Sequence, residues 1–229
     1  MRYEYEAKDR TLPTRQVYMP LSLPAAHTAW KSVQTYLESR ELNYTTALAN
    51  GWYPSKDAGD NALRLVIPAV NSNGTVYWQA RALNSADLPR YQSAPTPRGN
   101  SVIQVWPEQT DYIPLTIIVE GPMDALAAAS HGLRAIAIMG NHPTVEMYDM
   151  LVALIDTDKA VFYADKDALK ESVTIVATLL GRGVNIFLAD PSPYKDLAAT
   201  PRKKRGVALD MLRRMIEVSD QKINRQRDS

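Results

Sequence analysis

The sequence predicts an α/β protein with three parts: an N-terminal α+β subdomain, a second subdomain built on a mostly parallel sheet, and a C-terminal helix. Up to about residue 107 helical and strand-like segments do not alternate, whereas beyond it apolar strands alternate with helix-length segments, which is typical of βαβ units. Apolar residues at helical spacing after Pro201 predict the last helix.

The overall composition is that of a folded globular protein. The chain has 229 residues, 45% apolar and 22% charged, and a formal net charge of +1, which excludes a strongly basic whole-surface nucleic-acid binder. It contains no cysteine, so disulfides and thiolate zinc sites are excluded. No apolar run approaches the roughly 20 residues of a membrane span, and MRYEYEAKDR lacks the core of a signal peptide. We therefore expect a cytoplasmic location and no membrane partner.

The N-terminal part divides into an arm and a subdomain. Residues 1–22 are polar, proline-punctuated and without a period, so we expect an arm. Residues 23–110 form the expected subdomain. Its predicted elements are a helix over 25–42, a short helix over 45–50 that ends at Gly51, a strand over 63–70, a strand after the Asn73-Gly74 turn, and a strand over 101–106.

The second subdomain is expected over residues 111–200. Its apolar runs predict strands at 115–119, 135–139, 160–163 and 184–188, with helices at 122–131, 143–155 and 168–181 between them. This alternation favours a parallel sheet with helices on both faces. Residues 201–229 carry nine basic and four acidic side chains and form the expected C-terminal helix, whose RKKRG run we interpret as a solvated helix start.

Acidic side chains follow two of the predicted strands. Glu120 comes directly after the strand at 115–119, and Asp165 and Asp167 follow the strand at 160–163. At strand spacing the two aspartates would point to the same side, which is unfavourable unless a cation takes up their charge. Ligands of open parallel sheets bind at the carboxyl ends of the strands, so we expect these three carboxylates to converge. Hard oxygen ligands of this kind suit Mg²⁺.

Two residues beside Glu120 belong to the same motif. Gly121 permits the tight turn into the next helix, and Asp124 lies in the first turn of that helix, where an anion is favoured. An acidic residue after a strand is also a common helix N-cap, and a lone D-x-D is common by chance. The Glu-Gly pair and the D-x-D, each after a strand of one expected sheet, favour the functional interpretation.

The segments TIIVEGPMDALAAASHGLRAIAIMG and AVFYADKDA resemble the Toprim domain, a Rossmann-like domain shared by primases, topoisomerases and several nucleases. The form EG-x-M-D, the following His-Gly and the strand that ends at Gly140 are most similar to bacterial-type (DnaG-like) primases and their phage relatives. This resemblance covers roughly residues 115–200. Upstream, RLVIPAVNSNGTVYWQARAL and PRYQS resemble the part of the primase core that precedes Toprim, and YLESREL resembles the helix that opens it. The upstream matches are Arg64, Pro68, Gly74, Arg81, Arg90 and Tyr91.

The resemblance implies a DNA primase catalytic core, a nucleotidyltransferase that makes short RNA primers from NTPs on a single-stranded DNA template during phage or plasmid replication. It implies Mg²⁺, with Mn²⁺ as a possible substitute, held by Glu120, Asp165 and Asp167, with Asp196 in YKDLAA as a fourth ligand. It further implies that Arg64, Arg81 and Arg90 contact phosphate and that Tyr91 stacks or supports the strand. Lys166 would contact a nucleotide or offset the acidic charge.

The chain also departs from the family. Full-length primases of this type carry a cysteine-rich zinc module and a helicase part, so a replicative helicase and a separate zinc-binding module are expected partners. Leu169-Lys170 stands where the family has Ala-Gly after the D-x-D segment. Two alternatives stay open: a Toprim nuclease that hydrolyses phosphodiesters with the same metal site, and a non-catalytic DNA-binding replication accessory protein. The segment from Arg64 to Tyr91 favours the primase over the nuclease.

Overall fold

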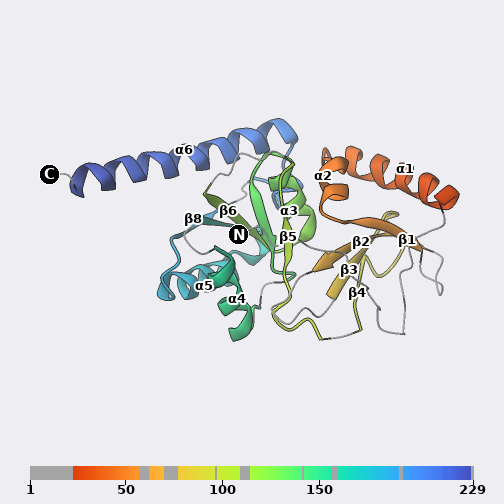
Figure 1. The fold of residues 1–229 in the computed structure, drawn as a ribbon, viewed down its shortest axis with the longest axis horizontal. Coiled ribbons are helices and arrows are strands. Elements are labelled where there is room, and N and C mark those ends of the chain that lie inside the picture. Colours follow the sequence, from red (N-terminus) through yellow and green to blue (C-terminus); the bar gives the residue numbers. More distant parts are fainter. Residues whose placement is uncertain are drawn as a thin grey trace.

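The β-strands in the described part of the chain form two sheets, each with its own helices (Figure 1). They are seen in a computed structural model, which describes residues 23–56, 62–69, 77–95, 97–108, 114–140, 142–155, 159–190 and 193–227. The predicted arm over residues 1–22 and the Asn73-Gly74 turn lie outside the described residues. The division of the chain at residues 110 and 111 stays a prediction.

The first sheet is antiparallel, with the strand order β1-β2-β3-β4. Its strands are β1 (Tyr53–Lys56), β2 (Leu63–Ala69), β3 (Tyr77–Ala82) and β4 (Tyr91–Ser93). Helices α1 (Leu23–Ser39) and α2 (Tyr44–Ala49) precede it, and the side chain of Asn43 caps α2 by accepting from the amide of Thr45. Helix α2 ends at Ala49, and Asn50 and Gly51 follow it. The φ of +73° at Gly51 is one that glycine adopts readily. The α+β character predicted for this part is therefore confirmed.

The second sheet has the strand order β5-β7-β6-β8-β9. Strands β6 (Leu115–Val119), β7 (Arg134–Ala137), β8 (Lys159–Tyr163) and β9 (Ile186–Ala189) are parallel, and β5 (Ile103–Val105) pairs antiparallel with β7. The mostly parallel sheet is thus confirmed. The strand expected over 101–106 is β5, which joins the second sheet as an edge strand although it precedes the expected boundary of the second subdomain.

Helices cover both faces of the second sheet. Every residue of β6 is buried, and its side chains alternate between the two faces, as strand geometry requires. Ile117 and Val119 pack in the core on the side of α3 (Pro122–Ala129), whereas Ile118 packs with α4 (Val145–Ile155) and α5 (Leu169–Gly181). A short 3₁₀ helix, η1 (Lys166–Ala168), leads into α5.

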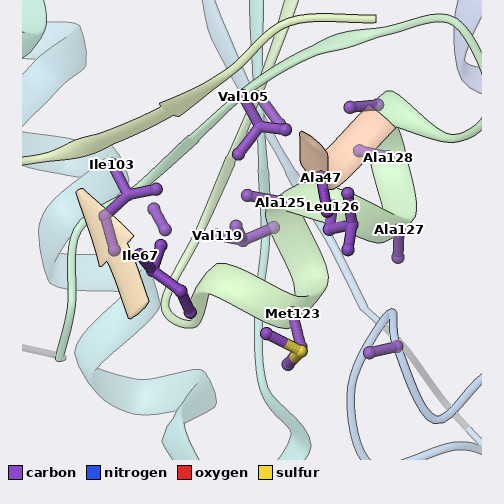
Figure 2. Close-up of a cluster of buried hydrophobic side chains, with 14 of the residues drawn as sticks. Ala47, Ile67, Ile103, Val105, Val119, Met123, Ala125, Leu126, Ala127 and Ala128 are labelled. Atoms are coloured by element: carbon purple, nitrogen blue, oxygen red, sulfur yellow. The ribbon is translucent and has the colours of Figure 1, made fainter. Parts of the chain in front are cut away.

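Helix α3 is buried along its whole length, because it lies between the two sheets (Figure 1). Figure 2 shows its side chains Met123 and Leu126 in one cluster with Ala47 of α2 and Ile67 of β2. Each fully buried side chain of this kind stabilises the fold by about 1.5–3 kcal/mol relative to exposure. One continuous core therefore joins the two halves of the chain.

Helix α6 (Arg202–Arg227) follows the second sheet and extends beyond the rest of the chain towards the C-terminus (Figure 1). Leu209 anchors its first half in the core, and Val207 and Met211 are exposed. No helix in the described part of the chain is both long and apolar enough to cross a bilayer.

Short strands were missed by the sequence analysis. Strands β1 and β4 were not predicted, since YPSK and YQS are too short and polar to show a period. Both are edge strands of the first sheet, held by backbone hydrogen bonds to a neighbour rather than by an apolar pattern of their own.

Candidate functional site

The chain brings Glu120 and Asp165 together at the carboxyl edge of the second sheet. Strands β6 and β8 are parallel neighbours, with Ile118 paired to Phe162, so the residues that follow them lie side by side. The carboxylate of Glu120 accepts a hydrogen bond from the backbone amide of Asp165. Its Oε1 atom is buried and has no hydrogen-bond partner among the residues that the structure describes. The central pair of the predicted site is therefore adjacent.

Burial and like charge oppose ionisation of this pair. Desolvation, followed by the charges of Asp165, Asp167 and Glu171, raises the pKa of Glu120 to about 7. Desolvation, followed by the charges of Asp196 and Asp167, raises the pKa of Asp165 to about 6, although Lys195 acts in the opposite sense. A divalent cation would relieve the repulsion at once.

Asp167 is placed differently from its expected position. The strand-spacing argument for the two aspartates was wrong, because β8 ends at Tyr163 and Asp165 is the residue that precedes η1. Asp167 lies within that 3₁₀ turn and is exposed, and its Oδ2 is 3.9 Å from Nζ of Lys195. Because Asp167 lies in a turn and not in a strand, its exposed carboxylate acts on Glu120 through its charge from outside the end of β8.

Asp124 and Gly121 form a tight unit beside the pair. Asp124 is only 7% exposed, and its Oδ1 accepts from the backbone amide of Ala198 at 2.8 Å. Burial and the nearby Asp196 raise the pKa of Asp124 well above its ordinary value. A Cβ atom at Gly121 would lie 2.8 Å from Oδ2 of Asp124. Gly121 is therefore needed for this close approach, whereas the expected need for glycine in the turn was wrong, because a φ of −110° is open to any residue.

Asp196 lies in the loop after β9, and its Oδ1 accepts from the amide of Ala199 at 2.6 Å. Its charge acts on both Asp124 and Asp165, so it belongs to the acidic cluster predicted from the sequence. Lys166 is exposed, and its backbone amide donates to the carbonyl of Lys195 at 2.8 Å, which joins the D-x-D turn to this loop.

The donor set fits Mg²⁺ in its chemistry but is not preassembled. Among the described residues, no three His, Cys, Asp or Glu side chains lie close enough to hold an ion. The three carboxylates are therefore not assembled into one group in the described residues: Glu120 and Asp165 are adjacent, and Asp167 is exposed beside them. Their joint role as metal ligands stays a prediction. Mg²⁺ binds through one or two carboxylates and keeps several waters, and the unpartnered Glu120 Oε1 is an available ligand of that kind.

Arg64 does not face solvent. It is 0% exposed, and its guanidinium donates to the carbonyl of Pro89 at 2.9 Å. The expected phosphate contact at Arg64 is therefore corrected: buried between strands, the side chain fixes the loop before β4 instead.

Arg81 and Tyr91 are paired across neighbouring strands of the first sheet. They are register partners of β3 and β4, and the guanidinium of Arg81 lies 4.7 Å from the centre of the Tyr91 ring. Arg81 is largely buried. Arg90, which directly precedes Tyr91 and β4, is exposed. Of the three predicted arginines, Arg90 is therefore the one whose side chain is exposed to solvent and to a bound strand.

Three further side chains contribute to the site although the sequence analysis gave them no role. The guanidinium of Arg40 lies 5.8 Å from the Tyr36 ring, and its charge acts on Asp124. The segment YLESREL contains both residues and is the signal that could have found them. Lys195, the neighbour of Asp167, stands beside Asp196 in YKDLAA.

Known proteins share this architecture. A family model described as Toprim-like matches residues 117–199. The crystal structure of the Aquifex aeolicus primase, with zinc-binding and RNA polymerase domains, superposes with a TM-score of 0.63 at 19% identity, covering 85% of this chain and 60% of that one. The chain has the fold of a Toprim-containing, DnaG-like primase core. A DnaG primase catalytic domain bound to single-stranded DNA matches this core at 17% identity with a TM-score of 0.58, over 82% of this chain and 72% of that chain.

A curated protein that is similar to this chain in sequence is a DNA primase from Thermotoga maritima. It is 29% identical over an aligned length of 141 residues, and the alignment covers 58% of this chain. The match spans only a quarter of the relative's length. The structural matches establish the fold, and the activity of the whole relative does not transfer with it.

The raised pKa values predict how the metal-free core depends on pH. Glu120 and Asp165 have ordinary pKa values of 4.5 and 3.8 and folded-state values of about 7 and about 6. The folded chain thus holds protons more tightly than the unfolded one, so this contribution to stability is complete below about pH 4 and is lost as the pH rises through 6 to 7. We expect Mg²⁺ to raise the melting temperature at about pH 8 and to have little effect at about pH 5.

Thermal melting with EDTA and with Mg²⁺ across this pH range measures the effect. A Glu120→Gln variant is the control, because it removes one of the two titrations and should flatten the pH dependence. A Mg²⁺ shift of equal size at both ends of the range would contradict the prediction.

Proposed function

We propose that the chain is the catalytic core of a DNA primase that makes short RNA primers on single-stranded DNA in a metal-dependent reaction. The observation that carries the proposal is the adjacent pair of Glu120 and Asp165 in a chain that keeps the upstream sheet with Arg81 and Arg90. A Toprim nuclease does not require this upstream sheet, whereas priming needs a surface that holds a template strand beside the acidic residues.

The roles follow from position. Bound Mg²⁺, or Mn²⁺ in its place, would neutralise the triphosphate and lower the pKa of the attacking 3′-hydroxyl. Glu120 and Asp165 would hold the ion, and Asp167 and Asp196 would supply further negative charge around it. Lys166 is exposed at the same turn, where it would meet a nucleotide phosphate.

Template binding is assigned to the first sheet. Exposed Arg90 would bind backbone phosphate, and the stacked pair of Arg81 and Tyr91 would hold the adjoining part of the strand. The solved relative bound to single-stranded DNA supports this class of partner. A replicative helicase and a separate zinc-binding module complete the proposed set of partners, in a phage or plasmid system that works in the host cytoplasm.

One assay separates this proposal from its alternatives. Purified chain is incubated with labelled NTPs, Mg²⁺ and single-stranded DNA, and product lengths are resolved on a gel. De novo oligoribonucleotides support the primase, whereas shortened DNA without NTP incorporation identifies a nuclease. Retained DNA binding without either product identifies a non-catalytic replication accessory protein.

Two arginines of the first sheet should behave in opposite ways. Arg90→Gln should weaken single-stranded DNA binding and lower the salt slope of log K by about one, with unchanged melting temperature. Arg64→Gln should leave that slope unchanged and lower the unfolding free energy by about 2–4 kcal/mol, because a buried hydrogen-bonded group is lost. Fluorescence anisotropy over a salt series and urea unfolding test the pair, and a reduced salt slope in Arg64→Gln would contradict the assignment.

A further inference from the structure

Arg205 is a buried arginine of α6, the helix that follows the loop of Asp196. It lies in the first turns of α6 and is 0% exposed, although the neighbouring Arg202, Lys203 and Lys204 are exposed. A buried guanidinium is costly unless its donors are satisfied. Its contacts therefore indicate why the chain keeps it.

The guanidinium of Arg205 donates three hydrogen bonds to the backbone of residues 197–200, the turn that follows Asp196. Its Nε donates to the carbonyl of Leu197 at 3.1 Å, and its Nη2 donates to the carbonyls of Ala198 at 3.2 Å and Thr200 at 2.9 Å. This turn immediately follows Asp196. All three acceptors are main-chain oxygens, so the side chain sets the shape of the loop whatever side chains the loop carries.

The same guanidinium reaches the N-terminal half of the chain. Its Nη1 donates to the carbonyl of Glu41 at 3.3 Å, just after α1, where Glu41 adopts a φ of +56°. The carboxylate of Glu41 accepts in return from the amide of Arg202. Arg205 thus connects three segments: the end of α1, the loop of Asp196, and α6.

The turn that Arg205 holds carries two amides of the site. The amide of Ala198 donates to Oδ1 of Asp124, and the amide of Ala199 donates to Oδ1 of Asp196. Both carboxylates therefore depend on the orientation of the turn for a hydrogen-bond donor.

We propose that Arg205 is a positioning residue of the acidic site, which holds the 197–200 turn so that its amides fix the Asp124 and Asp196 carboxylates. It does not touch substrate or metal; it acts through the turn. A lysine cannot replace it, because four acceptors in different directions require the planar fork of a guanidinium. The kinetic part of this inference rests on the proposed function, and the structural part does not.

The test compares three variants. Arg205→Met removes the donors and keeps an apolar side chain, Arg205→Lys keeps the charge, and Lys203→Met is the matched control, because it removes one positive charge from the same helix at an exposed site. Amide hydrogen exchange at Ala198 and Ala199, Mn²⁺ affinity by titration calorimetry, and primer synthesis over a Mg²⁺ series are measured.

We expect Arg205→Met to speed exchange at Ala198 and Ala199 and to weaken Mn²⁺ binding by about tenfold or more, the size typical of outer-shell changes. The exchange rates and the Mn²⁺ affinity of Arg205→Lys should lie between those of Arg205→Met and the wild type. Extra Mg²⁺ should restore part of the priming rate of Arg205→Lys. Lys203→Met should match the wild type. If Arg205→Met does not fold, Arg205→Lys decides.

Unchanged exchange and unchanged Mn²⁺ affinity in the Arg205 variants would overturn the inference. So would faster exchange spread equally over α3, because Arg205 would then support the whole fold rather than the turn. A wild-type chain that makes no primers, with exchange and Mn²⁺ responses as expected, would refute the proposed function and support the positioning role.

Discussion

Asp165→Asn is expected to abolish detectable primer synthesis, a loss of roughly a thousandfold or more, while the protein remains folded. The substitution keeps the shape of the side chain and removes one of the two adjacent carboxylates at the carboxyl edge of the second sheet. Metal neutralisation of the transferring phosphate is worth several kcal/mol, and about 4 kcal/mol corresponds to a thousandfold in rate. The gel assay with labelled NTPs measures the loss.

The same variant should be more stable than the wild type when no divalent metal is present. Desolvation and the charges of Asp196 and Asp167 raise the pKa of Asp165 to about 6 from its ordinary value of 3.8, so the ionised form opposes folding at neutral pH. Because the side chain is partly exposed, solvent screening reduces the gain to about 1 kcal/mol. Mg²⁺ should stabilise the variant less than it stabilises the wild type.

Asp149→Asn is the matched control for this charge change. Asp149 pairs with Arg182 on the exposed side of α4, away from the acidic cluster. Its replacement should leave priming unchanged and shift stability by no more than about 0.5 kcal/mol. Primer synthesis that survives in Asp165→Asn would remove Asp165 from the site.

Gly121→Ala is expected to lower primer synthesis by about a hundredfold and the unfolding free energy by about 1–3 kcal/mol. The backbone of Gly121, with φ −110° and ψ 151°, accepts any residue, so no backbone strain is involved. The cost comes from the new methyl group, which would lie 2.8 Å from Oδ2 of Asp124. Asp124 would have to move away from the amide of Ala198, and Glu120 would move with the turn.

Gly181→Ala provides the comparison. A Cβ atom there meets nothing within 4 Å, and the residue ends α5, where alanine favours helix. It should leave activity unchanged and stability equal or slightly higher. Kinetics and urea unfolding of both variants test the pair, and equal behaviour of the two would show that the approach to Asp124 carries no function.

Apolar periodicity was enough to predict the parallel strands of the second sheet and its helices, but not that β5 joins them. The strands at Leu115–Val119 and Lys159–Tyr163 are buried on both faces, so their runs are unbroken, and the acidic residues that follow them mark the strand ends. The neighbouring positions of Glu120 and Asp165 follow from sheet topology alone.

Tertiary contacts explain what the sequence could not predict. Arg64 and Arg205 look like surface cations in the sequence, and only the folded chain shows that backbone carbonyls of distant segments surround them. The turn at Asp167 was missed for a related reason. D-x-D has the same spacing in a strand and in a 3₁₀ turn, and only the folded chain shows the 3.0 Å hydrogen bond from the Ala168 amide to the Asp165 carbonyl that closes the turn.

Strand β5 has a practical consequence for anyone who divides this chain into pieces. A fragment that starts near residue 111 would lose β5, and the edge of β7 that it covers would become an open row of backbone donors and acceptors. Such a fragment is expected to self-associate through that edge. A soluble Toprim fragment should instead begin upstream of Val102, so that β7 keeps its partner.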